Sequence, residues 1–330
     1  MKNKINISII GYGKMGKIRF ESLIKNKNVH IKSIYDENSQ DVPSNLDVKN
    51  IDDIFQDNEV DGIIICTPNN LNFPLTKRGL KSSKFIFCEK PPAFSSKQII
   101  ELQNLEKLYN KFVMYGFNHR QHESIKKIKN LIDSKVFGKI LWMRGRYGKS
   151  VDNDFFKSWR SKKELSGGGI LFDQGIHMLD LFLHFVEDFD DVKAMISNSY
   201  WNLDIEDNVF AIFKNSKKNI TASLHSTMTQ WRHLFSLEIF LEKGYIVLNG
   251  LKTSSGTYGQ EKLTIAKNRS EPPAAIWEDE KSEIYNNEDF WIAETDEFVD
   301  SIINQRLPKF GDSIQAYNVL DLIEKVYNNA

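Results

Sequence analysis

The residue types best suited to catalysis fall in two separate stretches of the sequence. Lys90 follows the apolar run 85–88 and precedes Pro91. Asp173 and His177 come much later and are spaced so that, on a helix, they lie one turn apart and face the same ligand. Histidine suits proton transfer near neutral pH, and a neighbouring carboxylate tunes and orients it. Each stretch taken alone favours a structural role: a solvated lysine before a loop, or a capped amphipathic helix with a satisfied histidine.

The position of Lys90 follows from the proline that comes after it. Proline cannot donate to a strand ladder, so the strand predicted at 85–88 must end before Pro91. Open α/β sheets bind their ligands at the carboxyl ends of their strands. The sequence therefore predicts that Lys90 lies at the ligand-binding edge of a parallel sheet.

A glycine-rich stretch follows the first predicted strand, residues 5–10. Its pattern is G-x-G-x-x-G between a strand and a helix, the context in which the motif binds a dinucleotide; its residues are Gly11, Tyr12, Gly13, Lys14, Met15 and Gly16. A second predicted strand, 31–35, ends in Asp36, about 20 positions after the last glycine. A carboxylate there accepts the ribose hydroxyls and repels a 2′-phosphate. The pattern predicts NAD as the cofactor in preference to NADP.

Two further strand ends carry small or polar residues. The run 60–66 ends in Cys66, Thr67, Pro68 and Asn69, which suit contacts to the ribose–nicotinamide half of a dinucleotide, although proline and asparagine also form plain turns. The strand predicted at 112–117 ends in Asn118. We expect both strand ends to contribute to the cofactor site, and Asn118 to reach the substrate as well.

The pattern of elements changes near residue 120. Before it, strands alternate with helices predicted at 72–83 and 95–109, as in a doubly wound parallel sheet. After it, alternating apolar residues predict an α+β domain with a mostly antiparallel, open sheet, an irregular loop at 269–288 and helices at 289–305 and 313–327. The sequence thus predicts an α/β NAD-binding domain at 1–120 and an α+β substrate and oligomerisation domain at 121–330.

Composition excludes several classes of protein. The 330 residues include 44 Lys and Arg and 44 Asp and Glu, so no basic surface favours nucleic acid or a charged membrane. No apolar run approaches the roughly 20 residues of a spanning helix. The two cysteines, Cys66 and Cys88, are expected to be reduced core thiols, which favours the cytoplasm. No zincin pattern or cysteine cluster supports a metal at Asp173 and His177.

Taken together, these motifs resemble the Gfo/Idh/MocA family of oxidoreductases over nearly the whole chain. Coincidence is a poor explanation because five motifs occur in the right order and spacing; they are Gly11-Tyr12-Gly13-Lys14-Met15-Gly16, Thr67-Pro68-Asn69, Glu89-Lys90-Pro91, Trp159-Arg160, and Gly167-Gly168-Gly169 followed by Asp173 and His177. The resemblance implies a Rossmann domain followed by an open antiparallel sheet used in oligomer contacts.

The resemblance also implies roles for individual residues. Lys90 would lie between nicotinamide and substrate, beside Glu89 in the cofactor site, and Asp173 and His177 would reach the substrate. Trp159 and Arg160 would lie near the nicotinamide. The substrate implied is sugar-like, and five residues are candidates to line its pocket, although core packing is the expected role of most; they are Tyr200, Trp201, His225, Gln230 and Trp231. Of these, Trp231 is the one we assign to the substrate.

The leading functional hypothesis is an NAD-dependent dehydrogenase acting on a secondary alcohol of a sugar, nucleotide sugar or cyclitol. Two alternatives stay open: a glycosidase that uses transient oxidation by tightly held NAD, and a non-catalytic NAD sensor. Alternating apolar residues at 140–147, 209–213 and 235–240 further predict a homodimer or homotetramer packed sheet to sheet.

Overall fold

The structure is a computed structural model and describes residues 4–38, 40–254, 256, 258–268, 276–287 and 289–330. Its packing forms two compact units. The first consists of Met1–Asn118 and Asp289–Asp321, and the second of His119–Glu288 and Leu322–Ala330. The boundary of independently folding domains at residue 120 stays a prediction.

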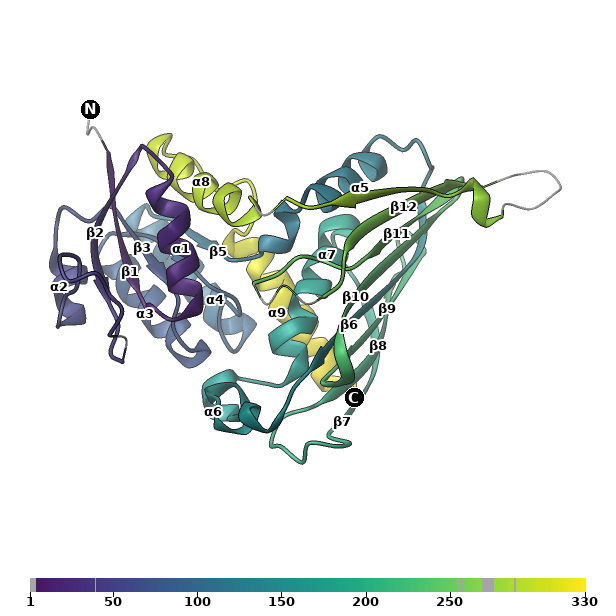
Figure 1. Cartoon of the computed structure of the whole chain (residues 1–330), viewed down its shortest axis with the longest axis horizontal. Helices are drawn as coiled ribbons and strands as arrows, with labels where there is room; N and C mark the ends of the chain where they lie inside the picture. Colours follow the sequence, from purple (N-terminus) through teal and green to yellow (C-terminus); the bar gives the residue numbers. More distant parts are fainter. Residues whose placement is uncertain (1–3, 39, 255, 257, 269–275, 288) are drawn as a thin grey trace. The chain divides into compact units, whose positions relative to one another are not determined.

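The first unit is a parallel sheet with helices on both faces (Figure 1). The strand order is β2-β1-β3-β4-β5. Strand β2 is added on one side of β1 and the later strands on the other side, so the doubly wound prediction is confirmed. The elements are β1 (Ile5–Ile10), α1 (Lys14–Ile24), β2 (Val29–Tyr35), α2 (Ile51–Gln56), β3 (Gly62–Ile65), α3 (Asn69–Lys81), β4 (Phe85–Cys88), α4 (Ser96–Tyr109), β5 (Val113–Tyr115) and α8 (Phe290–Ile303).

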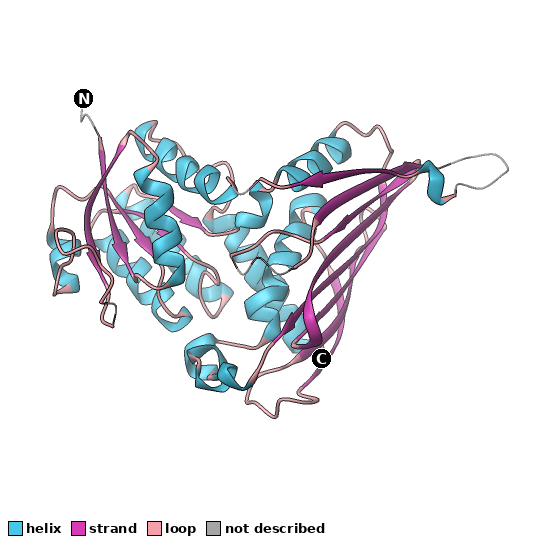
Figure 2. Cartoon of the chain, in the orientation of Figure 1, coloured by secondary structure: helices cyan, strands magenta, loops and turns pink. Residues whose placement is uncertain are grey.

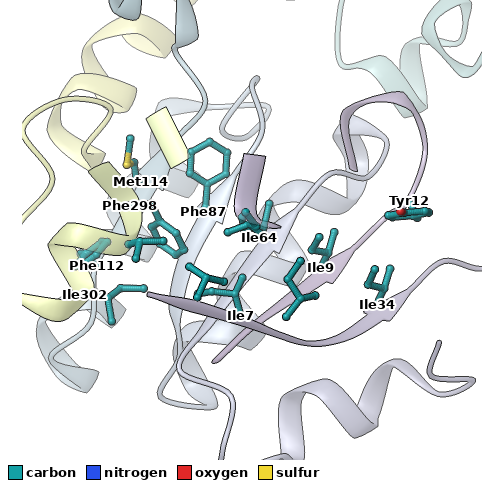
Figure 3. Close-up of a cluster of buried hydrophobic side chains, with 14 residues drawn as sticks. Ile7, Ile9, Tyr12, Ile34, Ile64, Phe87, Phe112, Met114, Phe298 and Ile302 are labelled. Atoms are coloured by element: carbon teal, nitrogen blue, oxygen red, sulfur yellow. The ribbon is translucent and has the colours of Figure 1, made fainter. Parts of the chain in front are cut away.

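The core of the first unit combines strand residues with a helix from the far end of the chain. Ile7, Ile64 and Phe87 come from neighbouring strands and are fully buried. Phe298 and Ile302 of α8 pack against them, as Figure 3 shows. Because both faces of this sheet are covered, its strands β3, β4 and β5 are continuous apolar runs, which made them predictable from the sequence.

The second unit contains one eight-stranded sheet, drawn in magenta in Figure 2. All neighbouring strands are antiparallel except β6 and β9, which confirms the mostly antiparallel prediction. The order β13-β12-β11-β10-β6-β9-β8-β7 is built from β6 (Ile140–Ser150), β7 (Asp191–Ser197), β8 (Asn208–Asn215), β9 (Ile220–Thr227), β10 (Thr229–Leu241), β11 (Gly244–Asn249), β12 (Glu261–Lys267) and β13 (Lys281–Tyr285).

Helices cover one face of this sheet. Figure 1 shows α5 (Glu123–Asp133) and α7 (Ile176–Val186) on the same side of it. Gly145 of β6 lets α7 approach closely, because a Cβ at this position would lie 2.5 Å from Cγ of Met178. The short helix α6 (Lys163–Ser166) belongs to the same unit, and α9 (Ser313–Asn328) begins in the first unit and ends in the second.

The prediction of an irregular loop at 269–288 is wrong at the carboxyl end of that range. Strand β13 forms there and pairs with β12, which the sequence analysis also missed. The sequence of β13 is Lys-Ser-Glu-Ile-Tyr and most of it is exposed, so no apolar alternation marked it. An edge strand needs only a partner for its backbone on one side. Pro272 and Pro273 lie outside the described residues.

Other predicted elements are confirmed. The sequence also predicts a hairpin between strands at 235–240 and 245–248, and the structure contains it as β10 and β11, with Leu241 opposite Gly244. The two carboxyl-terminal helices are α8 and α9, within a few residues of their predicted bounds. The short helix α2 was not predicted.

A buried arginine holds three distant segments of the first unit together. Arg19 of α1 is fully buried and donates from Nε to Glu89 Oε1 at 2.8 Å, and from its terminal nitrogen to Glu294 Oε2 of α8 at 2.5 Å. Its guanidinium also lies 4.3 Å from the ring centre of Phe87. Burial lowers the pKa of Arg19, but Glu89 and Glu294 more than offset this and hold it above the usual value.

Replacing Arg19 with methionine should therefore destabilise the chain strongly. The substitution Arg19→Met leaves two buried carboxylates without their cation, and breaking a buried pair in this way costs about 3–5 kcal/mol. Urea unfolding measures this loss. The matched control is Lys17→Met on the same helix, because Lys17 pairs with an exposed Asp41 and should leave the unfolding midpoint unchanged. Equal midpoints for both variants would refute the structural role of Arg19.

Candidate functional site

The glycine-rich turn after β1 is shaped by close backbone approach. Gly11 has φ +92°, and a Cβ there would lie 2.5 Å from the carbonyl oxygen of Cys66. A Cβ on Gly16 would lie 2.0 Å from the carbonyl oxygen of Gly11, so α1 packs directly on the turn. At Gly13, by contrast, no atom of the described residues beyond its chain neighbours lies within 4 Å of the Cβ position. The turn thus leaves open space beside the start of α1, where backbone N–H groups favour a phosphate.

Asp36, at the end of β2, lies beside this turn. One of its carboxylate oxygens accepts a hydrogen bond from the backbone N–H of Tyr12 at 2.5 Å, and the other accepts from the N–H of Asn38 at 2.8 Å. The Tyr12 ring is buried and packs edge-on against Phe20. Lys14 and Met15 begin α1. The structure therefore places Asp36 beside the glycine-rich turn, as an adenosine ribose next to a pyrophosphate requires. Binding of the cofactor by these residues stays a prediction.

The end of β3 is connected to the Lys90 turn by a residue that the sequence analysis overlooked. The Thr67 hydroxyl donates to Oδ1 of Asn72 at 3.3 Å. Asn72 Nδ2 in turn donates to the carbonyl oxygens of Glu89 at 3.1 Å and Pro91 at 2.8 Å, one on each side of Lys90. Asn72 is fully buried. The signal in the sequence was a polar residue, Asn72, among the buried positions of α3. Pro68 and Asn69 form the start of the same helix.

Glu89 and Lys90 differ in their surroundings. The Glu89 carboxylate is bonded to Arg19, which gives it a structural partner, and its predicted contact with the cofactor stays a prediction. Lys90 is partly exposed at the end of β4. Asn118 is buried just beyond β5, where the first unit ends. Their roles toward cofactor and substrate also stay predictions.

The helix that carries Asp173 and His177 does not begin as a regular helix. Leu171–Gly175 forms a π-helical turn, and α7 starts at Ile176. The N–H groups of Gly169 and Leu171 donate to the carboxylate of Glu206 at 2.9 and 3.0 Å. A Cβ at Gly169 would lie 2.0 Å from the Glu206 carbonyl oxygen. Gly169 of the triple-glycine stretch is thus required by the approach of Glu206, a partner that the sequence analysis missed.

Asp173 belongs to a charged group at the end of β6. Its Oδ2 accepts from Lys149 Nζ at 2.9 Å, and its Oδ1 lies 3.9 Å from Nε of Arg160. The Arg160 guanidinium lies 4.4 Å from the ring centre of Trp159. The structure thus joins the predicted Trp159, Arg160 and Asp173. Lys149 was missed, and its signal was a basic residue at the carboxyl end of an alternating strand.

His177 is buried against another histidine. Its ring stacks on His119 with the ring centres 4.0 Å apart and the planes 9° from parallel. His119 also shares a 3.0 Å hydrogen bond with the hydroxyl of Tyr147 on β6. No local pattern in the sequence marks His119, because its contact with His177 joins segments about sixty positions apart.

The helical spacing of the sequence predicts one polar stripe that contains Asp173, His177, Asp180 and His184. In the structure the last two residues have other surroundings than the first two. Asp180 is fully buried and accepts two hydrogen bonds from Arg120, at 2.8 and 2.6 Å. Burial, with lesser contributions from Arg120 and Lys129, lowers the pKa of His184 to about 3. Asp180 is therefore held in a structural ion pair, and His184 is neutral at physiological pH.

Trp231 lies at the surface of the second unit. It is 58% exposed and packs against Tyr200, with ring centres 4.8 Å apart. His225 stacks on the exposed Phe210. None of the five pocket candidates is buried, so the expectation that most would pack in the core is wrong; they lie in loops, near a strand start or on the uncovered sheet face.

The described residues contain neither a metal-binding cluster nor a membrane-spanning helix. No group of three or more His, Cys, Asp or Glu side chains in this part of the chain is arranged to hold a metal ion. Among the helices described, none is long and apolar enough to cross a membrane.

Two family models match the chain. Residues 5–117 match "Oxidoreductase family, NAD-binding Rossmann fold" and residues 125–247 match "GFO/IDH/MocA C-terminal domain". Among curated relatives, levoglucosan dehydrogenase of Pseudarthrobacter phenanthrenivorans is 31% identical over 44% of this chain and 37% of its own. Glucose-6-phosphate 3-dehydrogenase of Bacillus subtilis is 24% identical over 98% and 97%. The chain spans 53% or less of the first three relatives' lengths.

Solved structures share the fold. Levoglucosan dehydrogenase in complex with NADH matches with a TM-score of 0.85 and 20% identity over 99% of this chain and 97% of the other. Aldose-aldose oxidoreductase from Caulobacter crescentus matches with a TM-score of 0.84 and 19% identity over 99% and 97%. The two family models together span more than half of the chain, which therefore belongs to the Gfo/Idh/MocA family of oxidoreductases with an NAD-binding Rossmann fold.

Proposed function

We propose that the chain is an NAD-dependent dehydrogenase that reversibly oxidises a secondary alcohol of a sugar-like substrate. The observation that carries the proposal is the position of Asp36, whose carboxylate is bonded to the Tyr12 N–H of the glycine-rich turn. A carboxylate there binds ribose hydroxyls and repels a 2′-phosphate. Membership of an oxidoreductase family supports the chemistry.

For the substrate we propose a hexopyranoside, with carbon 3 as the first candidate for oxidation. Two relatives support this choice by name, D-glucoside 3-dehydrogenase of Escherichia coli and glucose-6-phosphate 3-dehydrogenase of Bacillus subtilis. Nucleotide sugars and cyclitols also carry ring secondary alcohols and belong in the same screen.

Each catalytic candidate receives one role in this proposal. When bound, the nicotinamide supplies the hydride acceptor. His177 takes the hydroxyl proton, and Lys90 donates a hydrogen bond to the same oxygen and stabilises its developing negative charge. Asp173, whose charge is balanced by Lys149, accepts hydrogen bonds from neighbouring sugar hydroxyls. Asn118 and Trp231 complete the proposed substrate contacts.

The test is a screen of sugars and nucleotide sugars with NAD. We expect net NADH formation and a keto-sugar product with at least one hexopyranoside. Substrate cleavage without net NADH, by protein that retains NAD through purification, would favour the glycosidase instead. NAD binding with no turnover of any sugar would favour the sensor.

The position of Asp36 predicts cofactor preference. The unmodified chain should bind NAD at least about tenfold more tightly than NADP, because a carboxylate and a phosphate at close range repel each other. Asp36→Asn keeps the hydrogen-bond acceptor but removes the charge, so titration calorimetry should show a smaller difference between the affinities for NAD and NADP. Glu37→Gln, at the exposed next position, is the control and should leave this difference in affinity unchanged. Equal affinity of the unmodified chain for both cofactors would contradict the proposal.

The role of His177 predicts a loss of turnover without a loss of cofactor. His177→Asn is close in size but cannot cycle a proton, so kcat should fall about 10²- to 10⁴-fold while NAD still binds. Lys90→Met should be at least as damaging, because it removes a donor and a positive charge together. Stopped-flow measurement of NADH formation gives the rates.

The control for this experiment is His184→Asn on the same helix. His184 is already neutral near pH 7, so its replacement should affect stability and leave kcat close to the unmodified value. If His177→Asn kept nearly full turnover with an unchanged pH profile, proton transfer would have to be reassigned, with Lys90 as the next candidate.

We also propose a homodimer or homotetramer formed through the uncovered face of the large sheet. The apolar alternation that suggested this points mostly inward: Met143, Tyr147 and Phe235 are buried. The opposite face nevertheless exposes its own apolar side chains, including Met195 at 78%, Phe210 at 51% and Ile212 at 55%. Met195 and Phe210 are cross-strand neighbours. A contiguous exposed apolar patch of this kind is typical of an interface.

Charged substitutions on this face should therefore yield monomers. At micromolar concentration, sedimentation should show a dimer or tetramer for the unmodified chain and a monomer for the double variant Phe210→Asp, Ile212→Asp. Ile100→Asp, at a similarly exposed apolar residue of α4, is the control and should sediment like the unmodified chain. A monomeric unmodified chain would contradict the proposal.

A further inference from the structure

His119 and His177 form a closely matched pair within the second unit. Their rings are nearly parallel, 9° apart, with centres 4.0 Å apart. Both side chains are buried, with 3% and 6% exposure. His119 comes from the turn Asn118–Gln121 and His177 from the first turn of α7. The contact is thus fixed by two separate elements.

The ring of His119 is anchored on its other side by Tyr147. The Tyr147 hydroxyl lies 3.0 Å from Nε2 of His119. Tyr147 is itself packed edge-on against Phe235 and Tyr258, and burial raises its pKa well above the usual value. Its hydroxyl therefore keeps its proton and holds the His119 ring in place across the working pH range.

The charges around the pair are already matched with partners. Arg120 is bonded to Asp180, and His122 shares a 2.9 Å hydrogen bond with Glu261. Asp173 accepts from Lys149 and lies near Arg160. Tyr147 and Tyr258 are neutral, since burial raises the pKa of both. Protonating either imidazole would place its charge 4.0 Å from the other ring centre, closer than the 5.9 Å between the rings of His119 and His122.

We propose that His119 is a positioning residue for His177: its stacked ring fixes the orientation of the His177 imidazole, and mutual repulsion makes the pair take up its second proton only at lower pH than its first. Two like charges 4 Å apart in a buried site repel strongly, so taking up the first proton disfavours the second. Under this arrangement, one neutral imidazole is retained to lower pH than an isolated histidine would allow. The inference rests on the proposed role of His177 as the proton acceptor.

The chain contains its own reference for this effect. His225 stacks on Phe210 with ring centres 3.9 Å apart and planes 8° from parallel, nearly the same geometry. Phenylalanine cannot take up a proton. His225 should therefore titrate as a single group, whereas His119 and His177 should titrate as a coupled pair with two macroscopic steps.

The test is an NMR pH titration of the full chain with isotope-labelled histidine. In the unmodified chain we expect the pair to take up its two protons in steps separated by more than about one pH unit, a tenfold difference in proton affinity. In His119→Phe, which keeps a stacked ring, and in His119→Gln, which keeps a partner for Tyr147, His177 should titrate in one step at higher pH than the second step of the pair. The His225 curve should be unchanged.

The titration requires no turnover, so it separates this inference from the proposed activity. If His177 takes up its proton in one step at the same pH in the unmodified chain and both variants, the coupling is refuted even in an active enzyme. If the chain oxidises sugars, the acid limb of kcat/KM should move to higher pH in His119→Phe by the same amount as the NMR curve. A variant that lost activity without this movement would show that His119 serves only packing.

Discussion

The buried Arg19 cation is the constraint on which the first unit depends. It lies on α1, which begins in the glycine-rich turn, and it bonds to Glu89 next to Lys90 and to Glu294 on α8. A fully buried guanidinium is tolerated only when anions surround it. The requirement therefore fixes the helix that faces the proposed pyrophosphate site, the turn that carries Lys90 and a helix from the far end of the chain relative to one another. Asn72, which carries no charge, holds the same turn through hydrogen bonds to the carbonyl oxygens of Glu89 and Pro91.

In the second unit, other contacts hold the segment that carries Asp173 and His177. The Glu206 carboxylate accepts hydrogen bonds from backbone N–H groups where the π-helical turn begins. The bidentate pair of Arg120 with Asp180 holds the adjoining turn of α7. π-helical turns are rare and occur often at functional sites. Asp173 lies within this turn and joins a charged group with Lys149 and Arg160. His177 lies just after the turn and stacks on His119. One short segment thus presents a carboxylate and an imidazole in unlike surroundings.

The sequence allowed good prediction wherever local pattern and burial agree. Continuous apolar strands, the glycine-rich turn with Asp36, and Lys90 before Pro91 follow from chain-local rules. The failures are long-range or polar. His119, Lys149 and Glu206 acquire their importance from partners many positions away, and the exposed strand β13 lacks any apolar signature. Asp180 looked equivalent to Asp173 by spacing, and only the position of Arg120 distinguishes them.

The central claim is that a hydrogen leaves a sugar carbon as hydride and arrives on nicotinamide. Its most direct test is turnover of a hexopyranoside carrying deuterium on the oxidised carbon, followed by mass spectrometry of the reduced cofactor. The account predicts one deuterium per NADH formed, together with a slower hydride-transfer step than with the unlabelled sugar. NADH free of deuterium, or product formation with no reduced cofactor at any stage, would contradict it.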